Sequence, residues 1–371
     1  MRSSTSSSDP EIADRSVPMG LWLRPFVLAG LVFCLAVALL EGVLAMRGFK
    51  PTVVDSGDRW ARERARVDGL GERAFIVIGA SRAQLDLDLH SLATRTGMAP
   101  VQLAIDGNSY VPVLEDLAAD ERVRGTVLVE YQDGALRSGF PDDRAVEYVK
   151  YWRHLRTHGM SLNFESSESA LVKVRQAWMR SYADGAGPWM ALSMRVMVPN
   201  AVPQYLVTLP DRQREANYSV VPMPGFYFQR VMRNAGIEKP PTAPDFASLN
   251  QMLSARIDQL QPLDAPDLGG RASHIAALVH RIEERGGAVI FVMFPRSGLV
   301  WSADERRFPR SRYWDRFITL TGAHGVHFED VPALSAFRCP DGSHLDFRDQ
   351  AAFTNALIDT MASRGWLTRS H

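Results

Sequence analysis

The sequence predicts an α/β fold in which a parallel sheet is covered by helices on both faces. Short apolar runs alternate with helical patterns before residue 135 and again after residue 270, and each run is about the length of one buried strand. Such alternation is typical of βαβ units, whose crossover helices cover both faces of a parallel sheet. A long apolar segment near the N-terminus and a less regular stretch from about 140 to 265 stand outside this rhythm.

The apolar segment is residues 26–46, FVLAGLVFCLAVALLEGVLAM, which contains one charged residue, Glu41. About 20 apolar residues suffice for a helix to cross the hydrocarbon of a bilayer. The segment is too long for the apolar region of a cleaved signal peptide, and core helices rarely reach this length without polar residues. We therefore expect a transmembrane anchor at 26–46, preceded by a cytoplasmic tail at 1–25. Glu41 is expected to reach the interface, with pairing to a partner's membrane helix as the alternative.

The orientation of this anchor does not follow from its flanking charges. Basic residues lie on both sides, so the positive-inside count does not favour an outward C-terminus. We nevertheless place the large domain outside the cytoplasm, because a short tail followed by one span is the common layout of anchored proteins. The basic residues counted are Arg2, Arg15 and Arg24 before the segment and Arg47, Lys50, Arg59 and Arg62 after it.

The elements after the anchor follow in order from their residue patterns. Residues 47–72 are polar and rich in arginine, which indicates a helical or flexible stalk with solvated charges. The domain then extends over 73–371, and its apolar runs and amphipathic stretches mark strands and helices. We expect strands at 74–78, 101–105, 126–131 and 288–294, with helices at 87–96, from about 112, at 274–285, at 313–321 and at 347–363.

The stretch from about 140 to 265 is rich in Trp, Met and Pro, as in GPWMALSMRVMVPNAVPQYLV, and lacks the strand–helix alternation. We expect it to be a mainly helical and irregular insertion. Its aromatic and methionine side chains either pack a subdomain core or line a substrate groove, and packing is the commoner use of such residues.

Composition and charge restrict the classes of function. The 371-residue chain is 46% hydrophobic and 23% charged, which is typical of globular proteins. Its 42 basic and 42 acidic residues balance, and no basic stripe with interleaved aromatics occurs, so we expect no nucleic-acid partner. The two cysteines, Cys34 and Cys339, give neither a disulfide scaffold nor a cysteine metal site. No spacing of histidines and carboxylates predicts a metal site either.

Two short segments far apart in the chain carry the candidate chemistry. The predicted strand 74–78 ends on two small residues and then presents Ser81, at the edge where ligands of open α/β sheets bind. A nucleophilic serine needs a base within hydrogen-bond reach, and His344 in DGSHLD is the histidine with a fitting neighbourhood. In this Asp-x-x-His loop the carboxylate of Asp341 can hold one ring nitrogen while the other accepts the serine proton.

Together, IGASRAQ and DGSHLD resemble the nucleophile and Asp-x-x-His blocks of the SGNH/GDSL hydrolase family. The resemblance covers about 73–135 and 270–363, and it leaves out the anchor and the insertion. It implies a flavodoxin-like sheet, a catalytic triad of Ser81, His344 and Asp341, and chemistry that needs no cofactor.

The same resemblance implies an oxyanion hole. The backbone N–H of Ser81 and that of Gly107, in a second block AIDGNSY, would be two donors, and the side chain of Asn108 would be a third. An Asx-type turn is the alternative for Gly107 and Asn108. The third block departs from the family pattern, because VEYQDGA places Gln132 and Asp133 where Gly-x-Asn-Asp is expected. Gln132 is the residue that would donate in place of the asparagine.

Two arginines are candidate substrate contacts. Arg82 follows the nucleophile, and Arg296 lies just beyond the fourth predicted strand. Both would suit an anionic or polyhydroxylated substrate, and ordinary salt bridging is the alternative.

A single-span anchor before an SGNH-like domain is similar to bacterial envelope proteins that move acyl groups on polysaccharides, such as alginate-type O-acetyltransferases and the D-alanyl transfer protein of teichoic acid. The resemblance implies a protein of the bacterial inner membrane with its domain in the periplasm or outside the cell. The expected activity is transfer or hydrolysis of an acyl ester on a cell-surface or exported polysaccharide, with a multi-span membrane acyltransferase as partner. The alternative is a non-catalytic accessory or glycan-binding module. In that case the altered third block would reflect the loss of catalytic activity.

Overall fold

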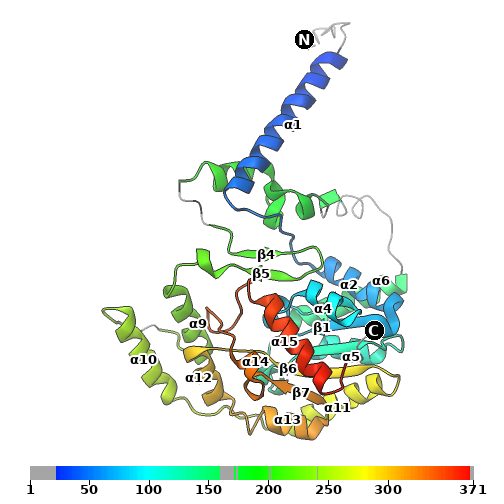
Figure 1. The fold of residues 1–371 in the computed structure, drawn as a ribbon, viewed down its shortest axis with the longest axis vertical. Helices are drawn as coiled ribbons and strands as arrows, with labels where there is room; N and C mark the ends of the chain where they lie inside the picture. The colour runs from blue at the N-terminus through cyan, green and yellow to red at the C-terminus, as the bar shows by residue number, and fades with distance from the viewer. Residues whose placement is uncertain are drawn as a thin grey trace, which may run out of the picture.

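The computed structural model describes residues 22–158, 171–172, 174–199, 201, 203–239 and 241–367. Most of the predicted tail, 1–25, lies outside these described residues. Figure 1 shows one long helix that stands away from an α/β domain containing most of the described chain.

The predicted α/β class is confirmed by a five-stranded sheet, in the order β2-β1-β3-β6-β7, in which each neighbouring pair is parallel. Four of these strands match predicted ones. The fifth, β7, is not predicted by the sequence patterns, because HGVH is short and contains no apolar run. The strands are β1 (Ala74–Ile78), β2 (Ala99–Gln102), β3 (Thr126–Glu130), β6 (Ala288–Met293) and β7 (His324–His327).

Helices cover the sheet in two layers. Helix α4 contacts α15, while α5 contacts α6 and α11, and α11 in turn contacts α13. In Figure 1, α4 and α15 lie in front of the strands. The helices are α2 (Gly57–Leu70), α3 (Ser81–Leu85), α4 (Leu89–Thr96), α5 (Val111–Ala119), α6 (Asp143–His158), α11 (Leu268–Glu283), α12 (Gly298–Arg307), α13 (Trp314–Thr321), α14 (Pro332–Ser335) and α15 (Gln350–Ser363).

The sheet forms the centre of the hydrophobic core. Every residue of β1 and β3 is buried, as expected for central strands covered on both faces. Phe291 of β6 meets Tyr110 and Phe317 edge-to-face, with ring centroids 5.9 and 4.9 Å apart. Burying one such aromatic side chain contributes roughly 1.5–3 kcal/mol. The carboxyl ends of β1 and β3, which carry the candidate site, are therefore held by a well-packed scaffold.

The expected stalk at 47–72 is wrong for most of its length, because α2 packs into the domain. Trp60 of α2 is fully buried, and its indole N–H donates to the carbonyl oxygen of Leu103 at 2.9 Å. Arg64 is also fully buried and pairs with Asp116 and Asp120, each at 2.9 Å. The arginine-rich pattern indicated solvated charge, but these acidic partners lie more than fifty positions later in the chain and give no local signal.

The expected insertion at about 140–265 is partly helical, as predicted, but it also contains a two-stranded antiparallel ribbon of β4 (Leu206–Thr208) and β5 (Arg214–Ala216). These strands are too short to produce an alternating pattern in the sequence. Two further helices of the insertion, α9 (Gly225–Ala235) and α10 (Phe246–Asp258), pack with α12 around a small apolar cluster. The insertion thereby reaches the edge of the sheet that carries the candidate site.

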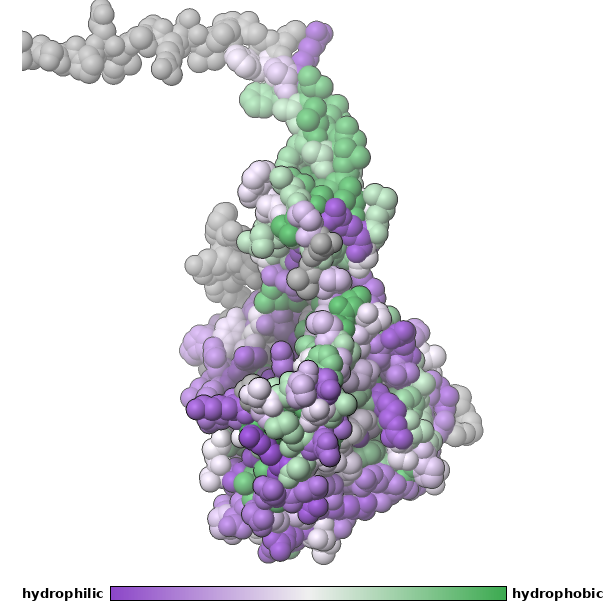
Figure 2. Space-filling model, turned by 90° about the vertical axis from the view of Figure 1, so that its left-hand side faces the viewer, coloured by the Kyte–Doolittle hydropathy of each residue, from purple (hydrophilic) through white to green (hydrophobic). Residues whose placement is uncertain are grey.

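Helix α1 (Leu23–Met46) is long and apolar enough to cross a membrane, and it includes the predicted span 26–46. Most of its side chains are exposed, and Figure 2 shows a continuous hydrophobic surface along it. Near its C-terminal end Glu41 accepts hydrogen bonds from the backbone N–H groups of Arg180 and Ser181 at 2.9 and 2.8 Å.

Candidate active site

The structure brings together the three residues of the predicted triad. Ser81 is the first residue of α3, directly after β1, and its Oγ lies 2.8 Å from Nε2 of His344. Nδ1 of His344 lies 2.9 Å from Oδ2 of Asp341. The histidine and the aspartate are buried, whereas Ser81 is half-buried. The predicted contact between Ser81 and His344 is therefore confirmed, across 263 positions of the chain.

The small residues before Ser81 are explained by Glu130 at the end of β3. Gly79 has a φ of +146°, and a Cβ there would lie 2.4 Å from the Cβ of Glu130. Oε2 of Glu130 accepts from the backbone N–H groups of Ala80 at 2.7 Å and Ala83 at 3.0 Å. A buried carboxylate thus holds both sides of the turn that presents Ser81, and charge-assisted bonds of this kind are stronger than neutral ones.

The Asp-x-x-His loop is closed by the same carboxylate that holds the histidine ring. Oδ1 of Asp341 accepts from the backbone N–H groups of Ser343 and His344, both at 2.8 Å, which leaves Oδ2 for the imidazole. Nη2 of Arg230, in α9, lies 3.1 Å from that same Oδ2. The insertion therefore adds a cation to the triad, and because it comes from a distant amphipathic helix, no motif in the sequence indicates it.

Two contacts fix the nucleophile segment against the histidine loop. Arg82 donates from Nε and Nη2 to the carbonyl and hydroxyl oxygens of Ser343, at 3.1 and 2.8 Å. Oδ1 of Asp86 accepts from the backbone N–H of Leu345 at 2.9 Å. Arg82, predicted to contact substrate, is thus engaged within the protein while still lining the cavity beside Ser81. These bonds keep the serine and histidine at a fixed separation.

The electrostatics place the triad in the protonation state of a general base. Burial lowers the pKa of His344 below its usual value, and the positive charges of Arg230 and Arg82 oppose protonation further, although the Asp341 carboxylate partly offsets them. Burial alone would raise the pKa of Asp341, but its hydrogen bond to His344 and the charges of His344 and Arg230 hold that pKa well below its usual range. Near neutral pH the imidazole is accordingly neutral and the carboxylate ionised.

Two backbone donors of the predicted oxyanion hole belong to residues that line the same cavity. Ser81 is the first residue of α3, where an α-helix leaves N–H groups without an intrahelical acceptor. Gly107 has a φ of +71°, and its N–H donates no hydrogen bond to any described residue. Both residues line the cavity. An oxyanion formed beside Ser81 would have these two donors to stabilise it.

The side chain of Asn108, predicted as a third donor, is used elsewhere in the fold. Its Nδ2 donates to the carbonyl of Asp106 at 3.2 Å, and its Oδ1 accepts from the backbone N–H groups of Arg144 and Ala145 at the start of α6. Gln132, the candidate replacement, accepts from Tyr110 N–H at 3.2 Å and donates to the carbonyl of Asn108 at 3.0 Å. Both amides hold the loop that carries Gly107.

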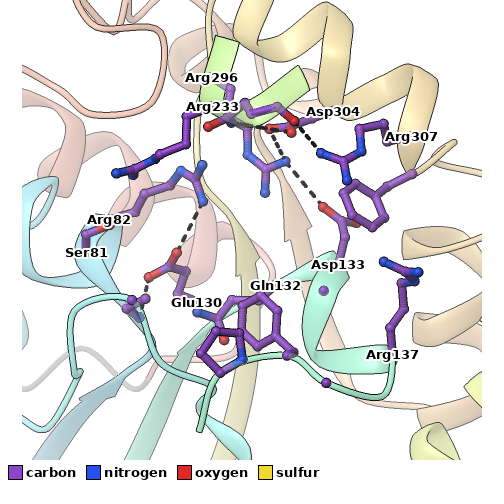
Figure 3. A pocket seen from close by; sticks show the side chains of 18 of the residues that line it. Ser81, Arg82, Glu130, Gln132, Asp133, Arg137, Arg233, Arg296, Asp304 and Arg307 are labelled. Carbon is purple, nitrogen blue, oxygen red and sulfur yellow. Dashed lines mark hydrogen bonds and ion pairs between the residues drawn. The ribbon is translucent and has the colours of Figure 1, made fainter. Parts of the chain in front are cut away.

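A cavity of about 580 Å³ opens beside Ser81. Figure 3 shows Ser81 and Arg82 at one side of it and Arg137 and Arg307 at the other. Its lining residues include Ala80, Ser81, Arg82, Gly107, Glu130, Gln132, Asp133, Gly134, Arg137, Phe140, Arg233, Asn234, Arg296, Asp304, Arg307 and Phe308. Such a volume lies within the range of small-molecule sites.

Arg296, the other predicted substrate contact, is a buried member of the cavity wall. Its Nη1 lies 3.3 Å from Asp133 and 2.8 Å from Asp304. Burial raises the pKa of Asp133 to about 6, although Arg296 opposes that shift. The charge of Arg296 is therefore compensated within the protein. Arg296 forms salt bridges, which was the alternative to a substrate contact, although these salt bridges are buried.

Three other arginines line the cavity and were not singled out by the sequence. Within the described chain, Arg137, Arg233 and Arg307 have no carboxylate partner. Arg137 and Arg307 each donate to a backbone carbonyl, of Asp264 and Asn234. Burial lowers the pKa of the Arg233 guanidinium, as does the nearby charge of Arg230, whereas the charges of Asp106 and Asp341 oppose that shift.

Comparisons with protein-family models and with curated proteins find no match for this chain. Among the described residues, no group of three or more His, Cys, Asp or Glu side chains is arranged to hold a metal ion.

Proposed function

We propose that the protein is a membrane-anchored serine enzyme that transfers or hydrolyses acyl esters on a cell-surface or exported polysaccharide. The observation that carries the proposal is the continuous chain of contacts from the Ser81 hydroxyl through His344 to Asp341. A serine hydroxyl becomes an effective nucleophile when an adjacent neutral histidine can take its proton. The resemblance of the two sequence blocks to SGNH/GDSL hydrolases supports the same chemistry.

The reaction follows from these positions. Nε2 of His344 removes the hydroxyl proton while Oγ of Ser81 forms a bond to the acyl carbon, and the carbonyl oxygen becomes an oxyanion that the N–H groups of Ser81 and Gly107 stabilise. The carbon–oxygen bond to the leaving alcohol then breaks, and His344 returns the proton to that alcohol. Water or a sugar hydroxyl next gives its proton to His344 and attacks the acyl carbon. The bond from that carbon to Oγ of Ser81 then breaks, His344 returns the proton to Oγ, and the acid or a new ester is released.

The charge of the cavity bears on the substrate. Arg137, Arg233 and Arg307 offer guanidinium groups that form no ion pair with a described carboxylate. Arginine binds carboxylates and phosphates with paired donors and also donates to hydroxyl oxygens. A polyhydroxylated substrate with a negative charge near the ester fits this lining better than an apolar ester does.

Helix α1 gives the proposed location. We infer that it anchors the protein in the bacterial inner membrane, with the domain on the periplasmic or outer side. A multi-span membrane acyltransferase would then be the source of acyl groups. The length and apolar composition of the helix support the anchor. The common layout of a short tail before one span and the resemblance support the side of the membrane, and the resemblance supports the partner.

The competing candidate is a non-catalytic glycan-binding module. It is favoured by the third block, because Gln132 stands where an asparagine donor is expected, and its carbonyl oxygen and one amide N–H hold the Gly107 loop. Loss of such a donor costs roughly 3 kcal/mol of transition-state stabilisation in enzymes that depend on it.

Ester turnover by the full-length protein in detergent distinguishes the two candidates. We expect release of p-nitrophenol from p-nitrophenyl acetate and of acetate from an O-acetylated acidic polysaccharide, and we expect Ser81→Ala to abolish both. Ser363→Ala is the matched control, since Ser363 is exposed at the end of α15, and it should retain both rates. Absence of turnover by folded wild-type protein, with binding of the polysaccharide retained, would establish the binding module instead.

A further inference from the structure

We propose that residues 171–172 and 174–199 form a collar that lies in the lipid headgroup region, with the bilayer itself as its binding partner. The proposal rests on the proposed role of α1 as membrane anchor. The collar contains a 3-10 segment (Arg180–Gly185), helix α8 (Pro188–Ala191) and a turn of π-helix (Leu192–Val196). In Figure 1 these residues run across the base of α1, between that helix and the β4–β5 ribbon.

Large apolar side chains of the collar face outward instead of packing into the domain. Trp178 and Trp189 are each 77% exposed. Clustered exposure of this kind marks an interaction surface, and tryptophan in particular is enriched where proteins cross the membrane–water interface. The other exposed apolar residues of the collar are Leu171, Val174, Met190, Met194, Met197 and Val198.

Contacts with α1 fix the position of the collar along that helix. Leu44 of α1 is fully buried and packs in one cluster with Ala191 of α8. The carboxylate of Glu41 accepts from the N–H groups of Arg180 and Ser181, so the one acidic side chain of α1 is satisfied by the collar backbone. The collar and the last two turns of α1 therefore form one packed unit.

The length of α1 places that unit at the edge of the hydrocarbon. The stretch from Leu23 to Leu40 rises about 27 Å at 1.5 Å per residue, close to the roughly 30 Å thickness of a bilayer core. Glu41 then falls at the boundary, and its bonds to Arg180 and Ser181 hold the collar at that depth. A protein partner is not needed to account for this pattern, because the apolar side chains are spread around a helix that lipid would already surround.

The surface below the apolar side chains suits lipid headgroups. A hollow of about 510 Å³ is lined by Arg47 and Arg195 beside Phe49 and Met197. Arg195 pairs with Asp184 at 3.4 Å, whereas Arg47 pairs with no carboxylate among the described residues. Guanidinium groups with apolar walls fit a phosphate and the first part of its acyl chain, and basic side chains near an anionic membrane surface add attraction. The collar thus combines an apolar outer face with a cationic base, as interfacial segments do.

Site-specific fluorescence in nanodiscs of phosphatidylcholine and phosphatidylglycerol tests this proposal on the full-length protein. In a Cys34→Ser background, Trp178→Cys, Trp189→Cys and Met194→Cys each carry an environment-sensitive nitrobenzoxadiazole probe. Leu320→Cys is the control, because Leu320 is exposed in α13, at the opposite end of the molecule from α1. Native Cys34, exposed on α1, is labelled separately as a reporter of the span.

We expect blue-shifted emission at the three collar sites and quenching by a lipid that carries a spin label near its headgroup, with neither effect at Leu320. Quenching at the collar no stronger than at Leu320 would overturn the proposal. A blue shift without quenching by lipid would overturn it as well, because protein would then cover the collar. If Cys34 itself escapes lipid quenching, the anchor is refuted, whereas quenching at Cys34 alone refutes the collar and leaves the anchor standing.

Discussion

Replacing Arg230 with methionine should move the acidic limb of the pH–activity profile to higher pH. Nη2 of Arg230 and Nδ1 of His344 bind the same oxygen of Asp341, at 3.1 and 2.9 Å, so the two nitrogens are at most about 6 Å apart. At that distance two unit charges repel by about 3 kcal/mol for an effective dielectric constant near 20. Since Arg230 retains some exposure to water, we expect about half of this repulsion energy. That energy corresponds to a shift of the acidic limb by about one pH unit.

The sign follows from the charge of the protonated histidine. Arg230 disfavours the imidazolium form, so removal of Arg230 raises the pKa of His344. Because activity needs the neutral ring, the variant loses activity at a higher pH than the wild type when the solution is acidified. The assay is acetate release from p-nitrophenyl acetate, quantified enzymatically after quenching, as kcat/KM across the acidic range. Arg230→Lys keeps the positive charge and should keep the limb in place. A limb that is unmoved in Arg230→Met, or displaced to lower pH, would refute the electrostatic role given to this arginine.

Three further changes follow from the same geometry. Glu130→Gln weakens the charge-assisted bonds to the nucleophile turn and should lower the free energy of unfolding by about 2 kcal/mol. Calorimetry that shows an unchanged Tm would contradict this expectation, and Glu72→Gln on the surface is the control. Gly79→Ala forces a side chain against Glu130 at a φ unfavourable for alanine and should destabilise the protein by at least about 2 kcal/mol. If the variant keeps wild-type stability and activity, the turn tolerates a Cβ and this expectation is wrong. Arg233→Ala should raise KM about tenfold for an acidic acylated saccharide and leave KM for p-nitrophenyl acetate unchanged; equal changes for both substrates would argue against charge recognition.

The fold was predictable where buried strands produce continuous apolar runs. The strands that carry the site, β1 and β3, are buried throughout and read as AFIVI and TVLVE. Prediction failed where long-range contacts decide the structure. Arg64 appears in the sequence as a surface charge, and only the folded chain brings Asp116 and Asp120 to it.

The candidate triad was predictable for a different reason. The Asp-x-x-His loop is a local arrangement, so Asp341 and His344 signal their pairing within four residues, and the end of a parallel strand specifies the edge on which Ser81 must lie. Glu130 did leave a signal, as a charged residue ending an apolar strand. Arg230 and Arg233 left none, since they come from an insertion whose position over the site depends on tertiary packing.

The central claim is that His344 activates Ser81, and covalent labelling tests it most directly. Full-length protein is treated with a fluorophosphonate probe, digested, and analysed by mass spectrometry for the modified residue. We expect one modification, on Ser81, that disappears in His344→Ala and persists in His280→Ala, where the replaced histidine is exposed on α11. Folded protein that takes up no probe, or that reacts at Ser81 equally well without His344, would contradict it.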